Sequence, residues 1–446
     1  MKDFLKRLNE IGKLKRVSQP LSTDLEISSV LFANQDEAYL FEKIKESSLA
    51  VAGNLYATIE TMKIGLGVPT SVDLAAFTRR SIDSPSSNKG HVSRFDKSSW
   101  DNNLEADLAK LPILKHYDRE AGHYMTAGIV AAKFPGTDSE NLSFHRMFVL
   151  SKNKLVARIV PRHLDQIAKD MRGQKVPVSI VIGPPPAVFL AASLQLQYGL
   201  SEYKIANRMM NEKLELESSE ETDIAVPTDS EIVLEGHLDY GELAKEGPFV
   251  DLTGTYDDIR EQPVVTITRM HYRKDSVYQA VLAGSKEHAL FMGLPQELKI
   301  RDALSKSIPK VHGINLTSSS NGYFHCVVSI EKANDGDGKT AIMNCFAASH
   351  PLKLVIVVDA DVDPFNLSEV EWALATRFQA DRGLMQINGA KGSSLDPSSA
   401  KSAVTSKLGL DATLPLKGDK AKFERAKIRV SPRAASVIAA LNGSSL

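Results

Sequence analysis

The sequence predicts a protein of mixed α+β and α/β class, with a central antiparallel barrel or curled sheet between two α/β regions. Its 446 residues exceed what one ordinary hydrophobic core organises, which favours two or three domains. Short β-rich runs separated by Gly, Pro, Asn and Asp dominate the chain from residue 125 to about residue 300. The last third instead alternates strand-like and helix-like segments.

The N-terminal α/β domain, expected over residues 1–112, opens with a predicted helix. Four apolar residues recur there at helical spacing and form one face: Phe4, Leu5, Leu8 and Ile11. The polar stretch 81–103, rich in Ser and Asp, predicts a linker or mobile loop.

The central domain, expected over residues 113–308, takes its strands from six β-rich runs. These are AGIVAAKF, SFHRMFVL, LVARIVP, VSIVIG, EIVLEGHL and VVTITRMHY. A helical insert at residues 186–211 interrupts the series.

The C-terminal α/β domain is expected over residues 309–446. Its apolar run 353–363 ends in acidic residues and is typical of a buried strand in a parallel sheet. The next segment, 366–378, predicts a helix in which Ser368 and Glu371 are spaced as a capping box.

The chain closes on a predicted apolar helix. Ser431 and Pro432 occupy the preferred N-cap and first-turn positions. A terminal helix of this kind packs either on a neighbouring subunit or on its own domain, and both arrangements stay open. A homodimer or higher homo-oligomer is the expected assembly.

Composition narrows the cellular setting and the partners. Lys and Arg number 54 against 55 Asp and Glu, which gives no reason to expect nucleic acid or a membrane surface as partner. Cys326 and Cys345 form no disulfide framework or zinc motif, which favours a reducing interior. The charged N-terminus lacks an apolar signal core, and prolines break the longest apolar run, 178–196. We therefore expect a cytoplasmic protein.

Polar groups gather in the apolar segment NLSFHR. Asn141 and Arg146 would face opposite sides of a regular strand, so they share a site only if Asn141 lies at the strand entrance or a bulge intervenes. His163 and Glu202 follow along the chain. Together with Asn141 they offer oxygen and nitrogen ligands that suit Mn²⁺ or Mg²⁺ better than structural zinc. For a lone histidine such as His163, an ordinary polar contact is the commoner role.

Two carboxylates flank a Gly-Pro corner in EGPFVD, at Glu246 and Asp251. A solvated turn is the simpler explanation for two acids at such a corner. Arg146, however, lies in an apolar segment and needs a buried or half-buried acid as partner. From the residues alone these two considerations are in tension.

Seven segments appear in the order and at the spacing of a known family: NLSFHR, RIVPRH, SEYKIA, EIVLEG, EGPFVD followed by TGTY, DADVDPFNLSEVEWALATRF and GAKGSSLDPS. On these motifs the chain resembles the UbiD family of prenylated-flavin-dependent decarboxylases from about residue 120 to residue 400, and more weakly before that. The resemblance implies that the central domain is a split β-barrel like that of flavin reductases.

The resemblance also implies three groups of site residues. The ligands of Mn²⁺ or Mg²⁺, with K⁺ as an additional ion, would be Asn141, His163 and Glu202. The catalytic network would be Arg146, Glu246 and Asp251. The residues lining prenylated FMN would be the three metal ligands together with Ser143, Phe144, His145, Arg146, Arg158, Ile159 and Val160.

The implied reaction is the reversible, non-oxidative decarboxylation of an α,β-unsaturated, aromatic or heteroaromatic acid. The cofactor acts as electron sink, Arg146 stabilises negative charge, and protonated Asp251 delivers the proton after CO₂ leaves. Val250 departs from the family, because glycine commonly precedes the last acid, and its bulk is expected to tighten the pocket. Lys353 is a weak candidate for a lysine near the cofactor phosphate, and we assign it no role.

The substrate stays open at this point. Segment 268–297 is expected to form a strand that walls the pocket, and its polar groups either recognise a second substituent or face solvent: His271, Arg273, His288 and Gln296. The compact length resembles furan-dicarboxylate decarboxylases and the archaeal decarboxylase of phosphorylated anhydromevalonate. Many of these short relatives carry Arg at the position of Gln296, which leaves an aromatic monoacid equally possible.

Two other functions would require different residues or motifs in the sequence. A flavin-binding assembly protein would be expected to lose Arg146, Glu246 or Asp251, and all three are present. A flavin-dependent oxidoreductase would need a nicotinamide site, and no GxGxxG motif occurs. The partners expected for a decarboxylase are a small carboxylic acid, CO₂ and a flavin prenyltransferase that supplies the cofactor.

Overall fold

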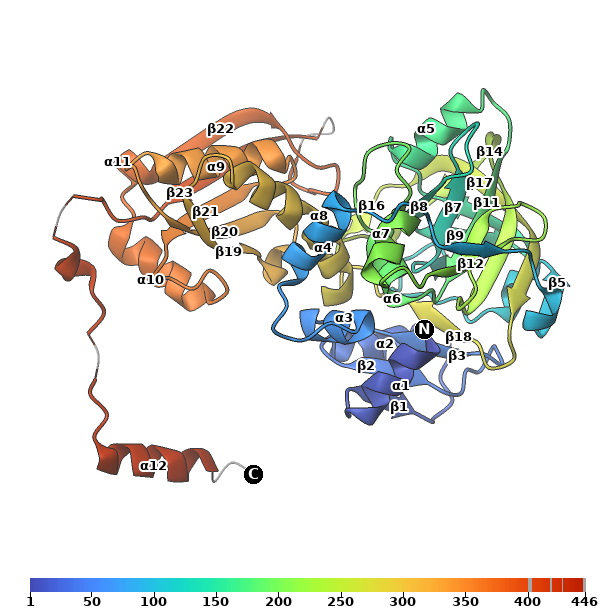
Figure 1. Ribbon diagram of the computed structural model, residues 1–446, viewed down its shortest axis with the longest axis horizontal. Helices are drawn as coiled ribbons and strands as arrows, with labels where there is room; N and C mark the ends of the chain where they lie inside the picture. Colours follow the sequence, from blue (N-terminus) through green and yellow to red (C-terminus); the bar gives the residue numbers. More distant parts are fainter. Residues whose placement is uncertain (400–402, 418, 427, 444–446) are drawn as a thin grey trace.

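The computed structural model describes residues 1–399, 403–417, 419–426 and 428–443. Three large sheets, of four, nine and five strands, organise the chain together with the helices around them (Figure 1). This is the mixed α/β multidomain architecture that the sequence predicts. None of the helices within the described residues combines the length and the apolar character that crossing a bilayer requires.

The N-terminal sheet draws its last strand from far along the chain. Its order is β1 (Leu14–Val17), β2 (Ala38–Phe41), β3 (Ala50–Gly53) and β18 (Val277–Ala280). Its helices are α1 (Lys2–Glu10), α2 (Glu26–Ala33) and α3 (Ile59–Leu66). The predicted first helix is confirmed as α1, which buries Phe4, Leu5 and Leu8. Ile11 lies beyond the helix end and is exposed.

The prediction of a loop over 81–103 is wrong in part. This stretch follows α4 (Leu74–Asp83) and contains β4 (His91–Ser93), the short turn η1 (Lys97–Ser99) and the start of β5 (Asn102–Glu105). β4 pairs with β12 (Glu215–Ser218), and β5 pairs with β17 (Arg260–Tyr272). Both partners lie more than a hundred residues away, so local composition gave no sign of them.

The nine-stranded sheet is the largest of the three. Besides β5 and β17 it contains β6 (Tyr124–Met125), β7 (Ile129–Lys133), β8 (Glu140–Phe144), β9 (Met147–Ser151), β10 (Lys154–Ala157), β11 (Val176–Ile182) and β14 (Ile232–Glu246). Around it lie η2 (Leu108–Lys110), α5 (His163–Asp170), α6 (Pro186–Ala191), α7 (Glu202–Met209), β13 (Ala225–Pro227), β15 (Phe249–Val250) and β16 (Tyr256–Asp257). The predicted helical insert is thus two helices, α6 and α7.

This sheet curls strongly. Its order runs β6-β9-β10-β17-β14-β11-β7-β8, which puts β8 at one end and β9 next to the other. Only His145 and Arg146 connect these two strands, so the two ends of the sheet must approach each other. Within the described residues no pairing joins them, and closure into a split barrel stays a prediction.

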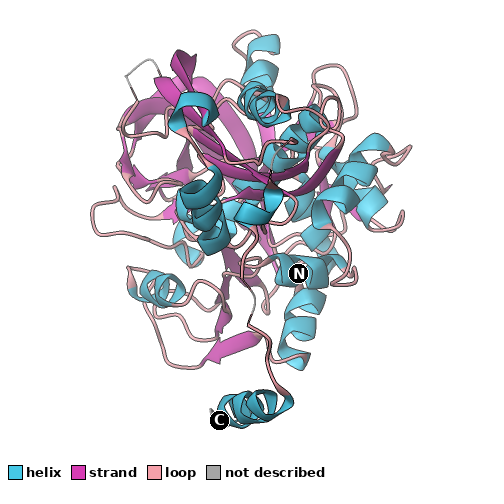
Figure 2. Ribbon diagram, turned by 90° about the vertical axis from the view of Figure 1, so that its left-hand side faces the viewer, coloured by secondary structure: helices cyan, strands magenta, loops and turns pink. Residues whose placement is uncertain are grey.

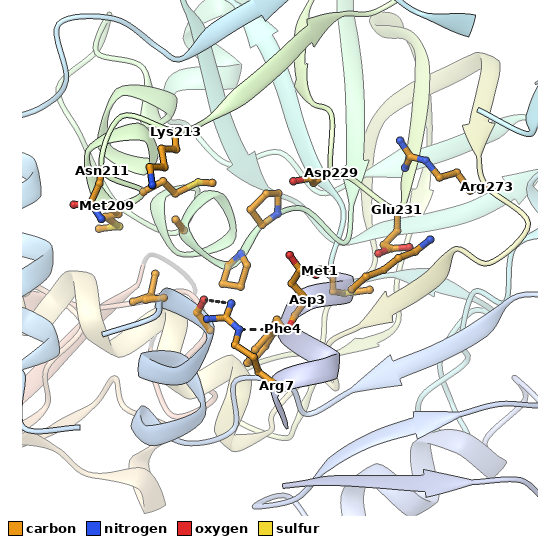
Figure 3. Close-up of a pocket in the computed structure, with 17 residues that line it drawn as sticks. Met1, Asp3, Phe4, Arg7, Met209, Asn211, Lys213, Asp229, Glu231 and Arg273 are labelled. Carbon is orange, nitrogen blue, oxygen red and sulfur yellow. Dashed lines mark hydrogen bonds between the residues drawn. The ribbon is translucent and has the colours of Figure 1, made fainter. Parts of the chain in front are cut away.

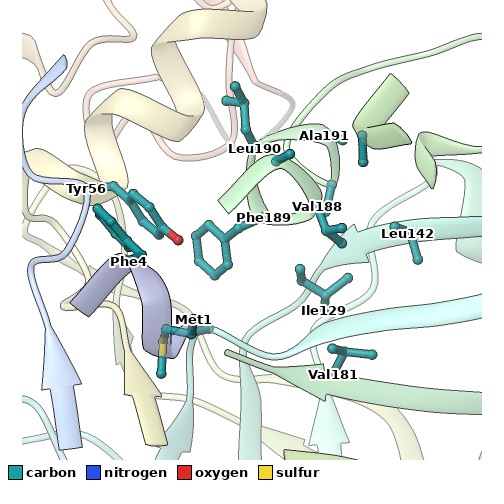
Figure 4. Close-up of a cluster of buried hydrophobic side chains, with 14 of the residues drawn as sticks. Met1, Phe4, Tyr56, Ile129, Leu142, Val181, Val188, Phe189, Leu190 and Ala191 are labelled. Carbon is teal, nitrogen blue, oxygen red and sulfur yellow. The ribbon is translucent and has the colours of Figure 1, made fainter. Parts of the chain in front are cut away.

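Aromatic packing ties the N-terminal region to the central sheet. The ring of Tyr56 stacks between Phe4 and Phe189, with centroids 5.2 and 5.1 Å away, and meets the edge of Phe291 at 5.5 Å (Figure 4). Rings of this size dominate the free energy of burial. Phe189 also contacts Phe144, at 4.7 Å, so the same cluster supports the end of β8.

The C-terminal sheet follows the long helix α8 (Lys286–Leu304). Its strands, in spatial order, are β19 (Lys310–Leu316), β20 (His325–Glu331), β21 (Leu354–Asp359), β23 (Val404–Asp411) and β22 (Leu384–Lys391). Its other elements are η3 (Ser318–Ser320), α9 (Asp337–Ala348), α10 (Leu367–Arg377) and α11 (Ala380–Gly383). β21 pairs in parallel with both neighbours, as its apolar run predicts.

The predicted capping box of α10 is displaced by two residues. Asn366, not Ser368, is the N-cap, and its side chain accepts a hydrogen bond from the Ser368 amide at 3.2 Å. Glu369, not Glu371, then hydrogen-bonds the Asn366 side chain, at 3.3 Å. Asn is as good an N-cap as Ser, so two adjacent candidates competed in the sequence.

The chain ends in an arm that leaves the body. After η4 (Lys420–Phe423), the helix α12 (Pro432–Gly443) lies apart from the rest of the molecule in both views (Figures 1 and 2). Ser431 caps it as predicted, since its hydroxyl accepts a hydrogen bond from the Ala434 amide at 3.2 Å. Apolar side chains on α12 are exposed: Val437, Ile438 and Leu441.

Candidate active site

The site is built around the guanidinium of Arg146, which lies in the two-residue connection between β8 and β9. Its Nε and Nη2 donate to the two oxygens of Glu246, each at 2.9 Å, and its Nη1 donates to Asp251. The side chains of Arg146 and Glu246 are buried. Because the break between strands frees Arg146 from strand alternation, it and Asn141 need not face opposite sides of the sheet.

The corner after β14 sets the positions of the two acids. Glu246 ends β14, and Gly247 follows with φ +103°, a conformation that favours glycine. The Gly247 amide donates to the hydroxyl of Tyr124 at 3.0 Å. Phe249 packs against Tyr124, with ring centroids 4.5 Å apart, and lies 4.7 Å from the Arg146 guanidinium. The apolar corner therefore forms the surface against which Arg146 rests.

A third acid, Asp257, was missed by the sequence analysis. Its Oδ2 accepts from Arg146 Nη2 at 2.9 Å and pairs with Arg260 at 2.7 Å. Burial would raise the pKa of Asp257, but the hydrogen bond from Arg260 and the charge of Arg146 hold it below its ordinary value. Nothing in TYDD distinguishes Asp257 from the exposed Asp258, so only the fold could identify it.

The three predicted metal ligands lie near one another around β8. The Oδ1 of Asn141 is 3.2 Å from Nδ1 of His163, which opens α5. Glu202 opens α7, and its Oε2 accepts from the Leu142 amide at 2.8 Å. The described residues contain no group of three or more His, Cys, Asp or Glu side chains that could hold a metal ion; the predicted set includes an asparagine.

Glu202 is a buried acid without a cation. Burial raises its pKa to about 8, and within the described residues it takes part in no ion pair. A bound divalent cation would stabilise a carboxylate in this position, and Asn141 and His163 would help to coordinate it. The donor set therefore fits Mn²⁺ or Mg²⁺.

Arg158 is the reverse case of Glu202: a cation without an acidic partner within the described residues. It is half-buried, it makes no ion pair within the described residues, and its Nη1 donates to the carbonyl of Ile159 at 3.1 Å. Burial, and then the charges of Arg260 and Arg146, lower its pKa. An anionic group on a bound cofactor would offset this charge, so the position fits a flavin.

The structure also gives the contacts of other residues that are predicted to line the flavin. Phe144 lies at the end of β8, and the Ile159 amide donates to Gln262 at 2.8 Å, which fixes the backbone before Val160. His145 is buried between the hydroxyl of Ser143 and the carbonyl of Arg158, at 2.9 and 3.0 Å. Burial lowers its pKa to about 4, so the ring is neutral near pH 7.

The predicted pocket strand 268–297 is corrected by the structure. It comprises the end of β17, β18 and the first half of helix α8. His288 and Gln296 lie on α8, and the Oε1 of Gln296 accepts from the Ser349 hydroxyl at 3.0 Å. Gly284 lies against the backbone of Asp251, and its amide donates to Nδ1 of His288 at 3.2 Å, so His288 lies near the Arg146 network. Burial lowers the pKa of His288.

His271 and Arg273 lie apart from this network. The Nε2 of His271 is 2.7 Å from Glu235, in a buried pair. Arg273 donates to the backbone carbonyls of Ser99, Ser230 and Thr228 and lies against a cavity of about 570 Å³ beside α1 (Figure 3). Neither residue contacts Arg146, Glu246 or Asp251.

Lys353 is engaged within the C-terminal domain. Its Nζ lies 2.9 Å from Asp396 and 2.6 Å from the Ser398 hydroxyl. It therefore carries no unpaired charge toward a cofactor phosphate.

Comparison with known proteins places the whole chain in one group. Three models of 3-octaprenyl-4-hydroxybenzoate carboxy-lyase match it: the N-terminal domain over 5–80, the Rift-related domain over 91–286 and the C-terminal domain over 289–412. Anhydromevalonate phosphate decarboxylase of Methanothermobacter thermautotrophicus is 39% identical over 432 residues, which cover 95% of this chain and 99% of that protein.

Solved structures agree with this placement. HmfF of Pelotomaculum thermopropionicum, a UbiD-class enzyme in complex with FMN, superposes with a TM-score of 0.92 and 32% identity, covering 97% of this chain and 98% of that one. An evolved dimeric form of the same enzyme, in complex with prenylated FMN, gives 0.87 and 31%, covering 96% of each chain.

Proposed function

Because the chain belongs to the UbiD family of carboxy-lyases, we propose that it is a prenylated-FMN-dependent decarboxylase acting on anhydromevalonate phosphate. The observation that carries the proposal is the 39% identity with an enzyme of that name over nearly the full length of both chains. This is narrower than the broad class of unsaturated and aromatic acids that the motifs alone suggest. The geometry around Arg146 supports the reaction type.

The fold and the cofactor sites are assigned as follows. The curled nine-stranded sheet is a split barrel within a central domain of residues 113–308, between domains at 1–112 and 309–446. Asn141, His163 and Glu202 would hold Mn²⁺ or Mg²⁺ beside the flavin phosphate. Prenylated FMN, when bound, supplies the electron sink for decarboxylation.

The protein's own groups do the remaining chemistry. Arg146 stabilises negative charge at the substrate carboxylate, and Glu246 holds the guanidinium in place through two hydrogen bonds. When the bond to the carboxyl carbon breaks, CO₂ leaves and its bonding electrons stay with the substrate. Asp251 then gives its proton to the carbon that lost CO₂ and recovers one from water.

Arg146 holds its two predicted acids differently. The guanidinium donates to both oxygens of Glu246 but to only one oxygen of Asp251. Glu246 is therefore the acid that fixes the guanidinium, and Asp251 is the acid that we assign to proton delivery.

Substitution Glu202→Gln tests the metal assignment. Removing the buried negative charge should lower bound manganese and flavin at least about tenfold, because even outer-sphere changes weaken metal sites by that amount. Elemental analysis and flavin absorbance of the purified protein measure both. The control Glu215→Gln, an exposed acid on β12, should leave both unchanged. Equal manganese and flavin in Glu202→Gln and wild type would refute the assignment.

The reaction itself is tested by co-expression with a flavin prenyltransferase, followed by a spectrum and a CO₂-release assay. The assay compares anhydromevalonate phosphate with its dephosphorylated form and with furan and benzoic acids. We expect a prenylated-flavin spectrum and release of CO₂ from the phosphorylated acid above all others. Ordinary FMN and no release from any acid would favour a flavin-binding protein without this activity.

We assign the exposed C-terminal arm, which carries α12, to contacts between copies of the chain in an oligomer. Its apolar side chains on α12 have no cover within the described part of the chain and would bury area against a second copy. A chain ending at residue 424 should therefore form smaller assemblies than the full chain in light scattering, with unchanged flavin content. The same mass per particle for both chains would exclude this role.

A further inference from the structure

A short loop packs against the hairpin that carries two of the acids around Arg146. This hairpin, residues 249–257, pairs β15 with β16 and contains Asp251 and Asp257. The Asp251 amide donates to the Thr255 carbonyl at 3.1 Å, so Asp251 moves with the hairpin. We call residues 116–121 the buttress loop.

The first strand of the hairpin and the corner before it both contact the buttress loop. The Ala121 amide donates to the carbonyl of Pro248 at 3.1 Å. The ring of His116 meets that of Phe249 edge to face, with centroids 6.4 Å apart. Because Phe249 also lies 4.7 Å from the Arg146 guanidinium, one ring separates the buttress loop from the centre of the site.

The second strand of the hairpin contacts the buttress loop as well. The Arg119 guanidinium lies 4.1 Å from the ring centre of Tyr256, and the Tyr256 hydroxyl accepts from the Arg119 amide at 3.2 Å. Tyr256 is paired with Val250 across the hairpin. The Tyr117 hydroxyl donates to the Ala283 carbonyl at 2.7 Å, which ties the loop to the end of β18 as well. The buttress loop therefore restrains both strands that carry the acids.

Glu120 gives the buttress loop its shape. Its Oε2 accepts from the amides of His116 and Tyr117 at 2.8 and 3.2 Å, and it lies 3.5 Å from Nδ1 of His116. The Glu120 amide in turn donates to the Tyr117 carbonyl at 3.1 Å. A side chain that accepts two amides of its own loop fixes those backbone groups in place.

This arrangement is costly for the fold. The side chains of Glu120 and His116 are fully shielded from solvent. Within the described residues, Oε1 of Glu120 and both ring nitrogens of His116 have no hydrogen-bond partner. Buried polar atoms without partners lower stability, and arrangements that do so are concentrated at functional sites. The pair therefore points to a role in the site's geometry.

We infer that Glu120 is a positioning residue for proton delivery: it shapes the buttress loop, which holds the hairpin and so sets the place of Asp251 relative to Arg146. Glu120 acts through the loop and not on the reacting atoms. The inference rests on the proposed function, because that function assigns the proton to Asp251.

The test compares Glu120→Ala with Glu120→Gln in the flavin-loaded protein. Alanine removes the acceptor of both amides, whereas the glutamine carbonyl can still accept them. Glu120→Ala should lower kcat about 10- to 100-fold with KM and flavin absorbance unchanged, because a misplacement of about 1 Å costs up to that much. Glu120→Gln should keep more than about half of the wild-type kcat.

Hydrogen exchange of backbone amides measures the placement of the hairpin without any turnover. In Glu120→Ala the amides of residues 249–257 should exchange about tenfold faster than in wild type, because the loop no longer restrains them. In Glu120→Gln they should exchange at the wild-type rate.

Glu235→Ala is the matched control for a loss of stability alone. Glu235 is also buried beside a histidine, His271, and its carboxylate accepts from the three amides of residues 220–222. This variant should unfold at a lower urea concentration than wild type. Its kcat and the exchange of residues 249–257 should stay at the wild-type values.

Arg119→Ala tests the same inference from the surface of the loop, with no buried group removed. Arg119 is exposed, and the substitution removes its contact with the Tyr256 ring. It should lower kcat about threefold and speed exchange in the hairpin, the effect of losing one exposed cation–π contact. Asp118→Asn, at an exposed position of the same loop, should behave as wild type.

Two results would overturn the inference. One is wild-type kcat and wild-type hairpin exchange in both Glu120→Ala and Arg119→Ala. The other is an equal loss of kcat in Glu120→Gln and Glu120→Ala with hairpin exchange unchanged, which would give the charge of Glu120 a role independent of the loop. If wild type does not decarboxylate the phosphorylated acid, the proposed function fails, and unchanged hairpin exchange in Glu120→Ala would still overturn the role of the loop.

Discussion

Asp251→Asn is expected to abolish turnover while the flavin stays bound. An amide in this position can still accept the hydrogen bond from Arg146, but it has no acidic proton to give to carbon. General acid catalysis contributes about 10²- to 10⁴-fold, so kcat should fall by about 10³-fold. CO₂ release and the flavin spectrum of the same preparation measure the two properties.

Asp258→Asn supplies the matched control for this experiment. Asp258 directly follows Asp257 after β16, yet its side chain is 92% exposed and its ion pair is with Arg260, at 3.8 Å. This variant should keep wild-type turnover. An Asp251→Asn enzyme that retains more than about a tenth of wild-type kcat would show that another group delivers the proton.

Arg146→Gln is expected to have the second large effect, on folding as well as on turnover. It removes the ion pairs of Glu246 and Asp251 with Arg146 and leaves Asp257 paired with Arg260 alone. Removing one partner from a buried ion cluster costs about 3–5 kcal/mol, so the free energy of unfolding should fall by that amount. Urea unfolding of the flavin-free proteins measures it.

An arginine at the surface of the central sheet, Arg269, provides the comparison. Arg269 lies on β17 and pairs with Glu221 at the surface, where ion pairs contribute little. Arg269→Gln should unfold at the wild-type urea concentration. If Arg146→Gln also does so, the three acids do not depend on this guanidinium, and the electrostatic account of the site fails.

Local pattern predicted the elements whose signal is local. The helical spacing of Phe4, Leu5 and Leu8 gave α1, and the apolar run at 354–359 gave the parallel strand β21. Strands that depend on distant partners were not located: β5 was missed, and β18 was predicted only as part of one long strand, because both form when the chain has brought β17 and β3 to them. Backbone pairing over such separations leaves no periodicity in the short segments themselves.

The candidate site likewise contains residues that the sequence predicted and residues that only the fold reveals. Burial demanded an acid for Arg146, and the structure supplies Glu246 and Asp251 at that place. Asp257 and Tyr124 were missed, since an acid in a turn and a tyrosine in a two-residue strand carry no signal of their own.

The crystal structure of the protein loaded with prenylated FMN and manganese tests the central claim most directly. We expect the flavin ring between Phe144 and Arg146, and its phosphate on a metal held by Asn141, His163 and Glu202. A flavin bound elsewhere, for example in the cavity beside α1 that Arg273 lines, would contradict the account. So would a metal without contact to Glu202.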